Sequence, residues 1–576
     1  MRVLILILLI LCFYLPFTSH SFNSVDDQEM LNTLLNTADK VDYFHLFFPK
    51  KHTYYYRPLL WLSFIFDQKT HFCSAYFMHL ENVLIHIFNV LIVFFIAKSL
   101  FKHNLPVYLT VFIFGIHPIN TEAVNWISAR TDILAGFFCF LAFFILIKYK
   151  NYFAVSLSAL FYLAGLLCKE TAIGFLPFAF IFMLYLYREK FSLKYRAFFV
   201  TVFILATVTY FFMRFPELRF WQQKTTANLN QLLPKGTKYV SSGSILYQIG
   251  VCFKVIGFYF KKLIFPWPLN FAIIKINKLF CLISGILITG FIIFFLLQER
   301  GIISISFLWT LCFIAPAILV PLRKLAWTPL AERYVYISSF GIALFLSFLF
   351  STIYQNAFDE KFKKGFQCIF TLYLIVFSIS TIHRNYLWQD NYRLYLDTVK
   401  KSPDFGPAHN ELAIALLKKG KREEAKKHFE IAAHLTKGYP LNPLAKSNVL
   451  ILEQGKLEPE EVLKRYDKLI EEAKKRKAKI AILHKAIKYI EGLMLEEKIN
   501  EKEKVNLYKK EIEYFKKLSY LDEPAFCHYR IGQLYLALGK KQEALLYFRR
   551  AHELAPEDAY FKKAAFKLVK KLSKNE

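Results

Sequence analysis

The chain has 576 residues, of which 55% are hydrophobic and 18% aromatic, and its mean hydropathy is +0.32. This composition excludes an ordinary soluble protein of that length and is typical of a polytopic helical membrane protein. The formal net charge is +30. The sequence has neither an aromatic-basic RNA motif nor zinc-finger spacing, so we do not expect it to bind nucleic acid. We expect the positive charge to bind anionic lipid head groups or a phosphate-bearing substrate.

Two regions of different composition follow each other along the chain. Apolar stretches of about 20 residues, the length that crosses a bilayer as a helix, recur through roughly the first two thirds. In the final third Lys, Glu and Ala become frequent and long apolar runs vanish. We therefore predict an all-α chain with a transmembrane domain at 1–383, a linker at 384–402 and a helical domain at 403–576.

The first apolar run, at 1–14, precedes two adjacent carboxylates. No small-x-small cleavage site follows the run, so we expect a first transmembrane helix with its N-terminus inside, and no cleaved signal peptide. Asp26 and Asp27 come next. Neighbouring like charges tend to raise one pKa and suit a general base or a cation ligand. The alternative is the acidic first turn of a helix capped by Ser24, and both interpretations can hold at once.

Further apolar segments predict a bundle of about 11 spans. Basic residues gather in alternate connections, which places those connections in the cytoplasm by the positive-inside rule. The segment 245–265 carries three lysines and is either a short span, which makes 12, or an amphipathic helix in the membrane interface, which leaves 11 and places the C-terminal domain outside the cytoplasm. The predicted spans after the first are 75–97, 105–116, 133–147, 153–167, 172–187, 197–213, 279–297, 302–320, 335–350 and 368–382.

Three polar clusters fall on the opposite, external side of this predicted bundle. They are the acidic pair, the stretch 117–132 and the connection 168–171. A fourth cluster, 332–334, joins them if there are 11 spans. Charged groups at the hydrocarbon boundary are costly unless they meet each other, water or a ligand, so this convergence indicates a functional site. The alternative is a set of ordinary polar loops.

The segment 75–97 carries a polar stripe. His79, Asn82, His86 and Asn89 recur at helical spacing, so one face of this helix should look into the bundle. The two histidines could ligate a metal. We expect them instead to form hydrogen bonds with neighbouring helices.

The C-terminal region contains a helical repeat. Residues 525–558 carry small and large side chains at tetratricopeptide positions, 406–438 repeat the pattern, and 441–520 are helical but degenerate. Such repeats stack into a concave surface that binds an extended peptide or a partner protein. The alternative is a scaffold that only packs against the membrane part. The positions in the last repeat are His528, Ile531, Gly532, Tyr535, Gly539, Ala544, Phe548, Ala551 and Pro556.

These motifs resemble the C-type membrane glycosyltransferases and, more closely, the transmembrane-and-tetratricopeptide family of protein O-mannosyltransferases. Asn120 stands where members of that family often have a second His. The resemblance is carried by Asp26 and Asp27, the segments 56–59 and 117–124, Arg130, Asp132, the segments 168–170 and 331–336, and the C-terminal repeats.

The resemblance implies an inverting transfer of a sugar from a polyprenyl phosphate, which enters from the lipid, to a hydroxyl of a protein or glycan. It places this reaction outside the cytoplasm, at the inner (plasma) membrane. Asp26 or Asp27 would take the proton of the acceptor hydroxyl, while Arg130, Lys169 and Arg333 would stabilise the leaving phosphate. A divalent cation bridging that phosphate is compatible with these residues, and metal dependence stays open. The supporting residues are Arg57, His117, Asn120, Thr121, Glu122, Asp132, Glu170, Glu332 and Tyr334.

A different class of function is a non-catalytic membrane anchor, with the repeats as a scaffold for assembly of envelope proteins or polysaccharides. An enzyme predicts a polar cleft open to lipid, in which the acidic pair faces the three cations. A scaffold predicts that the external loops fill this space. A transporter would be expected to show paired internal repeats with broken helices, and we find none in the sequence.

Overall fold

The computed structural model describes residues 2–18, 21–37, 41–49, 56–186, 188–190, 192–232, 245–298, 301–323, 326, 328–357, 359–440, 442–495, 499–556 and 559–573. The described residues form helices and their connections, with a single isolated antiparallel bridge between Ile273 and Leu330. The predicted all-α class is therefore confirmed. The chain divides into two compact units, Met1–Phe405 and Gly406–Glu576.

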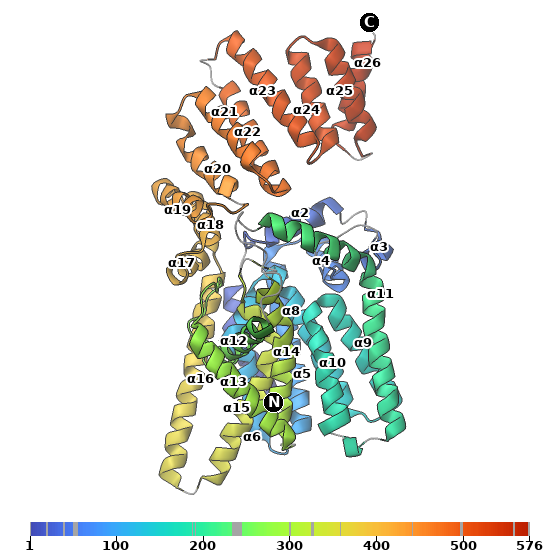
Figure 1. Ribbon diagram of the computed structural model, residues 1–576, viewed down its shortest axis with the longest axis vertical. Coiled ribbons are helices and arrows are strands. Elements are labelled where there is room, and N and C mark those ends of the chain that lie inside the picture. The colour runs from blue at the N-terminus through green and yellow to red at the C-terminus, as the bar shows by residue number, and fades with distance from the viewer. Residues whose placement is uncertain are drawn as a thin grey trace. The chain divides into compact units, whose positions relative to one another are not determined.

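The first unit contains a multi-pass set of apolar helices (Figure 1). In the described part of the chain, seven helices are long and apolar enough to cross a membrane, or eight if one bent pair counts as a span. This count is lower than the predicted 11 because three further apolar helices have only 10–17 residues. The long helices are α5 (Ala75–Leu100), α8 (Arg130–Lys148), α11 (Leu193–Leu232), α13 (Lys278–Leu297), α14 (Gly301–Arg323), α15 (Tyr336–Asn356) and α16 (Glu360–Trp388).

The bent pair has a clear cause in the sequence. Helix α6 (Asn104–Ile116) ends at His117, and the chain continues as η3 (Pro118–Asn120) and α7 (Thr121–Asn125), bent by 41°. Proline has no N–H to continue the helix, and its ring drives the preceding residue into extended backbone. His117 accordingly has φ −62° and ψ 121°. Beyond the bend, most side chains of the stretch 117–132 are buried.

Shorter elements complete the first unit. Helix α12 carries the three lysines and is not among the helices that qualify as spans in the described residues. Residues 384–402, predicted as a linker, form the end of α16 and the helix α17. The shorter elements include α1 (Arg2–Tyr14), α2 (Asp27–Thr37), α3 (Tyr43–Phe47), α4 (Pro58–His71), α9 (Tyr152–Cys168), η5 (Glu170–Gly174), α10 (Phe175–Ile181), α12 (Ile245–Ile264), η8 (Glu332–Val335) and α17 (Asn391–Lys401).

The polar stripe of α5 faces the inside of the bundle, as predicted. His86 contacts the Tyr336 hydroxyl through Nδ1 at 2.8 Å, and its Nε2 lies 3.1 Å from the Gly115 carbonyl oxygen. Asn89 donates to the same hydroxyl and to the backbone of α8, each at 2.9 Å. Buried polar groups must be paired, so these bonds fix the register of α5 against α8 and α15. Both ring nitrogens of His86 thus lie within hydrogen-bond distance of oxygens of the protein.

The second unit consists of paired antiparallel helices (Figure 1). Gly420 lies between the two helices of the first predicted repeat, and Gly539 lies between those of the last. Their φ angles are +76° and +72°, a conformation that favours glycine. A Cβ on Gly532 would come within 2.8 Å of the Phe548 ring, which shows why a small residue is needed there. The helices are α18 (Gly406–Lys418), α19 (Arg422–Leu435), α20 (Asn442–Glu453), α21 (Pro459–Glu472), α22 (Arg476–Met494), α23 (Glu501–Ser519), α24 (Pro524–Ala537), α25 (Lys541–Leu554) and α26 (Lys562–Ser573).

Candidate functional site

Asp27, at the start of α2, is joined to the stretch 117–132. Its Oδ1 accepts from the backbone N–H of Ser128 at 3.0 Å and from the Ser128 hydroxyl at 2.5 Å, and its Oδ2 accepts from Asn23 N–H at 2.9 Å. The side chain is fully buried, and burial raises the pKa of Asp27 to about 6 although these three bonds lower it. Asp26, its neighbour, is exposed.

The acidic loop also docks on α17. Ser24 donates from its hydroxyl to Tyr395 at 3.1 Å, and Tyr395 donates to the Asn23 side chain at 3.0 Å. Tyr395 thus holds Ser24 and Asn23 together. These contacts fix the backbone that carries both carboxylates, and they connect the acidic pair to the chain that follows the last apolar helix.

Arg130 is enclosed by protein acceptors. Its guanidinium donates to Asp67 at 2.7 Å and to Glu81 at 2.9 Å, from α4 and α5. Its remaining N–H groups reach the Asn82 side chain at 2.8 Å, the Met78 carbonyl at 3.1 Å and Ser63 at 3.5 Å. With five N–H donors all directed at the protein, this arginine joins three helices.

Two other predicted cations lie close to one aromatic ring. Lys169 Nζ is 2.6 Å from both oxygens of Asp132 and 5.4 Å from the centre of the Tyr334 ring. Arg333 donates to Glu122 at 2.5 Å and lies 4.9 Å from the same ring. Burial lowers the pKa of Lys169 to about 8, and Asp132 opposes that shift. The Arg333 side chain is 17% exposed, so solvent or a ligand reaches it.

Glu332 forms a second ionic group beside Arg333. Its Oε1 accepts from Lys262 at 3.0 Å and from the backbone of Asn270 at 2.8 Å. Its Oε2 lies 3.5 Å from Arg384, a residue near the end of α16. Arg384 is 1% exposed. This group therefore gathers side chains from α12, η8 and α16.

The remaining supporting residues divide into two sets. Arg57 donates to Glu170 at 3.1 Å, and Arg214 lies 3.2 Å from the other oxygen of Glu170. His117, Asn120 and Thr121 stabilise the bend itself. The Nε2 atom of His117 contacts the Leu263 carbonyl at 2.8 Å, and its Nδ1 accepts from the N–H of Ile119 at 3.2 Å. Asn120 donates to the Phe114 carbonyl at 2.9 Å, and Thr121 donates to the Pro118 carbonyl at 2.7 Å.

One group of side chains has metal-ligating composition. Asp67, His71 and Glu81 offer ligand atoms that all lie within 4.8 Å of one another. Arg130 occupies both carboxylates of this group, so a divalent cation there would compete with the guanidinium. The carboxylates of Glu122, Asp132, Glu170 and Glu332 are each paired with a cation of the protein.

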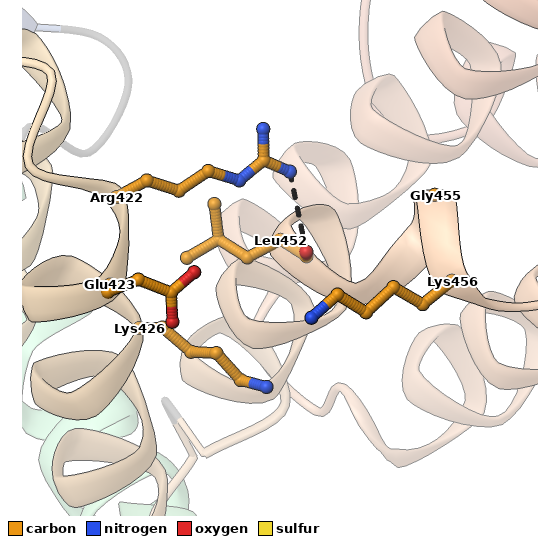
Figure 2. Close-up of a pocket in the computed structure, with 6 residues that line it drawn as sticks. All are labelled: Arg422, Glu423, Lys426, Leu452, Gly455 and Lys456. Carbon is orange, nitrogen blue, oxygen red and sulfur yellow. Dashed lines mark hydrogen bonds between the residues drawn. The ribbon is translucent and has the colours of Figure 1, made fainter.

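Two surface hollows stand out among the described residues, and the lining of the first includes Lys262 and Asn270, which bind Glu332. One, of about 370 Å³, is bordered in the first unit by α12, by the connection that follows it and by Asp404. The other, of about 210 Å³, lies in the second unit between α19 and the end of α20 (Figure 2). Figure 2 shows Arg422, Lys426 and Lys456 around it, with Glu423 beside them. Arg422 donates to the Leu452 carbonyl at 3.4 Å.

Several residues of this region could not be identified from the motifs alone. Arg384 lies beyond the predicted last span, Asp67 lies before the segment 75–97, and Glu81 lies on that segment but outside its polar stripe. A charged side chain at the end of an apolar segment is a signal for a functional or paired group, and it would have pointed to Arg384. Which carboxylate meets which cation depends on the packing of distant segments.

Comparison with known proteins gives independent information. The tetratricopeptide repeat model matches residues 525–558. Protein O-mannosyl-transferase TMTC3 of Homo sapiens is 23% identical over 421 residues, which cover 66% of this chain and 44% of that protein. Protein O-mannosyl-transferase F38B6.6 of Caenorhabditis elegans is 24% identical over 402 residues, covering 67% of this chain and 54% of that protein. Protein O-mannosyl-transferase Tmtc1 of Drosophila melanogaster is 33% identical over 124 residues, covering 20% and 14%.

The chain spans about half the length, or less, of the curated relatives it matches. Among solved structures, yeast Tom70 aligns with 81% of this chain and 92% of its own at 10% identity, with a TM-score of 0.22, which is too low to inform the fold. The predicted resemblance is confirmed at the level of sequence. Over two thirds of its length, the chain is a distant homologue of the TMTC protein O-mannosyl-transferases, and it carries a tetratricopeptide repeat near its C-terminus.

Proposed function

We propose that the protein is an integral membrane glycosyltransferase of the C-type class. It transfers a sugar from a polyprenyl phosphate to a hydroxyl of a protein or glycan on the extracytoplasmic side of the inner (plasma) membrane. The repeat unit binds the acceptor or a partner protein. The homology to O-mannosyl-transferases and the apolar helices support the membrane glycosyltransferase part of this proposal.

The observation that carries the proposal is the arrangement around the stretch 117–132. Asp27 is bound to Ser128 of this stretch, and Arg333 is bound to Glu122 of the same stretch. An acidic loop and a partly exposed cation, about 300 residues apart in the sequence, are thus tied to one short segment. A base and a phosphate-binding cation close together are what a sugar transfer from a lipid phosphate requires.

In the proposed mechanism, the oxygen of the acceptor hydroxyl attacks the anomeric carbon of the donor. The bond from that carbon to the phosphate oxygen breaks, its electron pair stays on the phosphate, and the anomeric configuration inverts. Asp26, which is exposed, takes the hydroxyl proton. Asp27, whose carboxylate is held by three hydrogen bonds, positions this loop.

The leaving phosphate is assigned to Arg333 and Lys169. Among the described residues Arg333 donates only to Glu122, so other N–H groups of its guanidinium are available to an anion. Lys169 lies near the same Tyr334 ring as Arg333 and adds a second positive charge. Arg130 is assigned a positioning role, because all five of its N–H groups are directed at the protein.

The proposed topology has 11 spans. The seven long helices, the bent pair and the three short apolar helices make up this number if each crosses the membrane. The amphipathic α12 then lies in the interface, and the repeat unit is extracytoplasmic. A reporter fused after Glu576 tests the side of the membrane directly.

The test of the proposed chemistry is transfer from a lipid-linked donor in membranes that contain the full chain. Asp26→Asn should lower turnover at least 100-fold, since general base catalysis contributes about 10²–10⁴-fold. Its unfolding should match that of the wild type. The matched control is Asp42→Asn, a change at another external carboxylate, which should leave turnover intact. Unchanged transfer in Asp26→Asn would exclude Asp26 as the base.

A non-catalytic scaffold is the second candidate. The observation that favours it is that Arg130, Lys169 and Arg333 each already have a carboxylate partner. A scaffold predicts that Asp26→Asn and Arg333→Gln leave every cellular phenotype of the wild type in place. It also predicts that disruption of the repeat unit alone reproduces the deletion.

A further inference from the structure

A set of buried polar atoms without hydrogen-bond partners surrounds Trp126 and Trp388. Among the described residues, this set comprises four donors and two acceptors that form no hydrogen bond, although Arg384 Nη2 and Glu332 Oε2 lie 3.5 Å apart as an ion pair. All five side chains that carry these atoms are at least nine-tenths buried. The donors are Trp126 Nε1, Trp388 Nε1, Arg384 Nε and Arg384 Nη2, and the acceptors are Glu122 Oε2 and Glu332 Oε2.

These atoms belong to one cluster. The rings of Trp126 and Trp388 are 6.2 Å apart between their centres. Arg333 lies 4.6 Å from the Trp126 ring and binds Glu122, while Arg384 lies 5.9 Å from the Trp388 ring. The members come from α7 with the residue that follows it, from η8 and from α16, so three distant segments bring them together.

Unmatched buried polar groups are costly, and each calls for an explanation. Phe271 packs edge-on against both tryptophan rings, at 5.7 Å in each case, so the surroundings are aromatic. An unmatched N–H in such surroundings loses its bond to water and gains nothing in return. A ligand that supplies the missing partners would remove this cost.

The chemistry of the unmatched atoms discriminates between ligands. A bare phosphate offers only acceptors, and it would be repelled by Glu122 and Glu332. A sugar offers hydroxyls that accept from the indole and guanidinium N–H groups and donate to Glu122 Oε2 and Glu332 Oε2, which accept no hydrogen bond. A mixed set of donors and acceptors is therefore complementary to a neutral polyhydroxyl group.

We propose that this cluster, formed by Trp126, Trp388, Arg384, Glu122 and Glu332, binds the sugar moiety of the donor. The proposal rests on the proposed function for the identity of the donor, and it assigns the sugar to a different place from the phosphate. The phosphate meets Arg333 and Lys169 at the partly exposed side of Tyr334. The hexosyl group meets the buried donors and acceptors behind it.

The test compares two lipids on the purified full chain in lipid nanodiscs. One is a polyprenyl phosphate that bears a hexose, from a panel with mannose, glucose or N-acetylglucosamine. The other is the same polyprenyl phosphate without a sugar. The wild type should bind at least one hexose-bearing lipid more tightly than the bare lipid.

Trp126→Phe and Trp388→Phe remove an N–H and keep an aromatic ring. Each should weaken binding of the hexose-bearing lipid about five- to tenfold, the loss expected for one hydrogen bond. Binding of the bare lipid should stay within twofold. Trp309→Phe is the matched control, because Trp309 Nε1 already donates to the Ile337 carbonyl at 2.8 Å. This control should leave the preference for the hexose-bearing lipid unchanged.

Three results would overturn the proposal. They are an equal loss of binding for both lipids in the tryptophan variants, no loss for either lipid, and no preference of the wild type for any hexose-bearing lipid. Failure of the proposed function looks different. A chain that prefers the hexose-bearing lipid through Trp126 and Trp388, yet transfers no sugar, would retain this site and lose the transferase assignment.

Discussion

Replacement of Arg130 by Met should unfold the membrane unit far more easily. The guanidinium is 1% exposed and bridges Asp67, which is 2% exposed, and Glu81, which is 26% exposed. Removing one partner of a buried pair costs about 3–5 kcal/mol, because the other charge stays buried without compensation. Lost bonds to Asn82 and Met78 cost about 1 kcal/mol each. We expect a destabilisation of about 4 kcal/mol or more.

The assay is denaturant-induced unfolding of the full chain in detergent micelles, followed by helical circular dichroism. Lys148→Met removes an exposed cation from the last turn of the same helix, and it should change stability by about 0.5 kcal/mol or less. In the double variant Arg130→Met/Asp67→Asn, about 1–3 kcal/mol of the loss should return, since the unpaired carboxylate is gone. A loss under about 1 kcal/mol in Arg130→Met, together with abolished donor binding, would refute the positioning role and assign Arg130 to the phosphate.

Three further outcomes are expected. Burial raises the pKa of Asp27 from 3.8 to about 6 in the folded protein. As the pH rises from about 4 to 6 in unfolding titrations, the wild type should therefore lose up to about 3 kcal/mol of its free energy of unfolding relative to Asp27→Asn. A stability difference between the two proteins that does not change with pH would contradict the burial of this carboxyl. Tyr336→Phe removes the hydroxyl that pairs with His86 and Asn89 and should cost about 1–3 kcal/mol in the same assay, whereas no change would mean that these groups find other partners. Gly532→Leu should drive a side chain into Phe548, cost about 1–3 kcal/mol and speed hydrogen exchange in α24 and α25; unchanged exchange would contradict the close helix contact.

Local patterns in the sequence predicted much of the architecture. The polar stripe of α5 required neighbours on one side, and its four side chains are buried in the bundle. The small residues of the repeats required two helices to approach closely, as Gly532 and Phe548 do. The bend at His117 follows from a proline whose effect is confined to its neighbours. In each case the cause and the result lie within a few residues of each other or in one helix.

The pairing of charges could not be predicted in the same way. Arg130 meets Asp67 and Glu81 because α4 and α5 pack beside the start of α8. Nothing in the local sequence distinguishes this arginine from Arg333, which has one carboxylate partner and is partly exposed. The span count also depends on context, since three apolar helices have only 10–17 residues and a bilayer is not defined by the chain alone. Long-range packing decides both questions.

The central claim is that the acidic loop bound to Ser128 and the cations around Tyr334 form a site for sugar transfer. The most direct measurement is mass spectrometry of exported proteins and surface glycans from cells that carry the wild-type gene, a deletion or only Asp26→Asn. The deletion should remove a hexose modification, and Asp26→Asn should remove the same modification although the protein is present in normal amount. A modification that persists at the wild-type level in Asp26→Asn cells would exclude Asp26 as the base of the reaction.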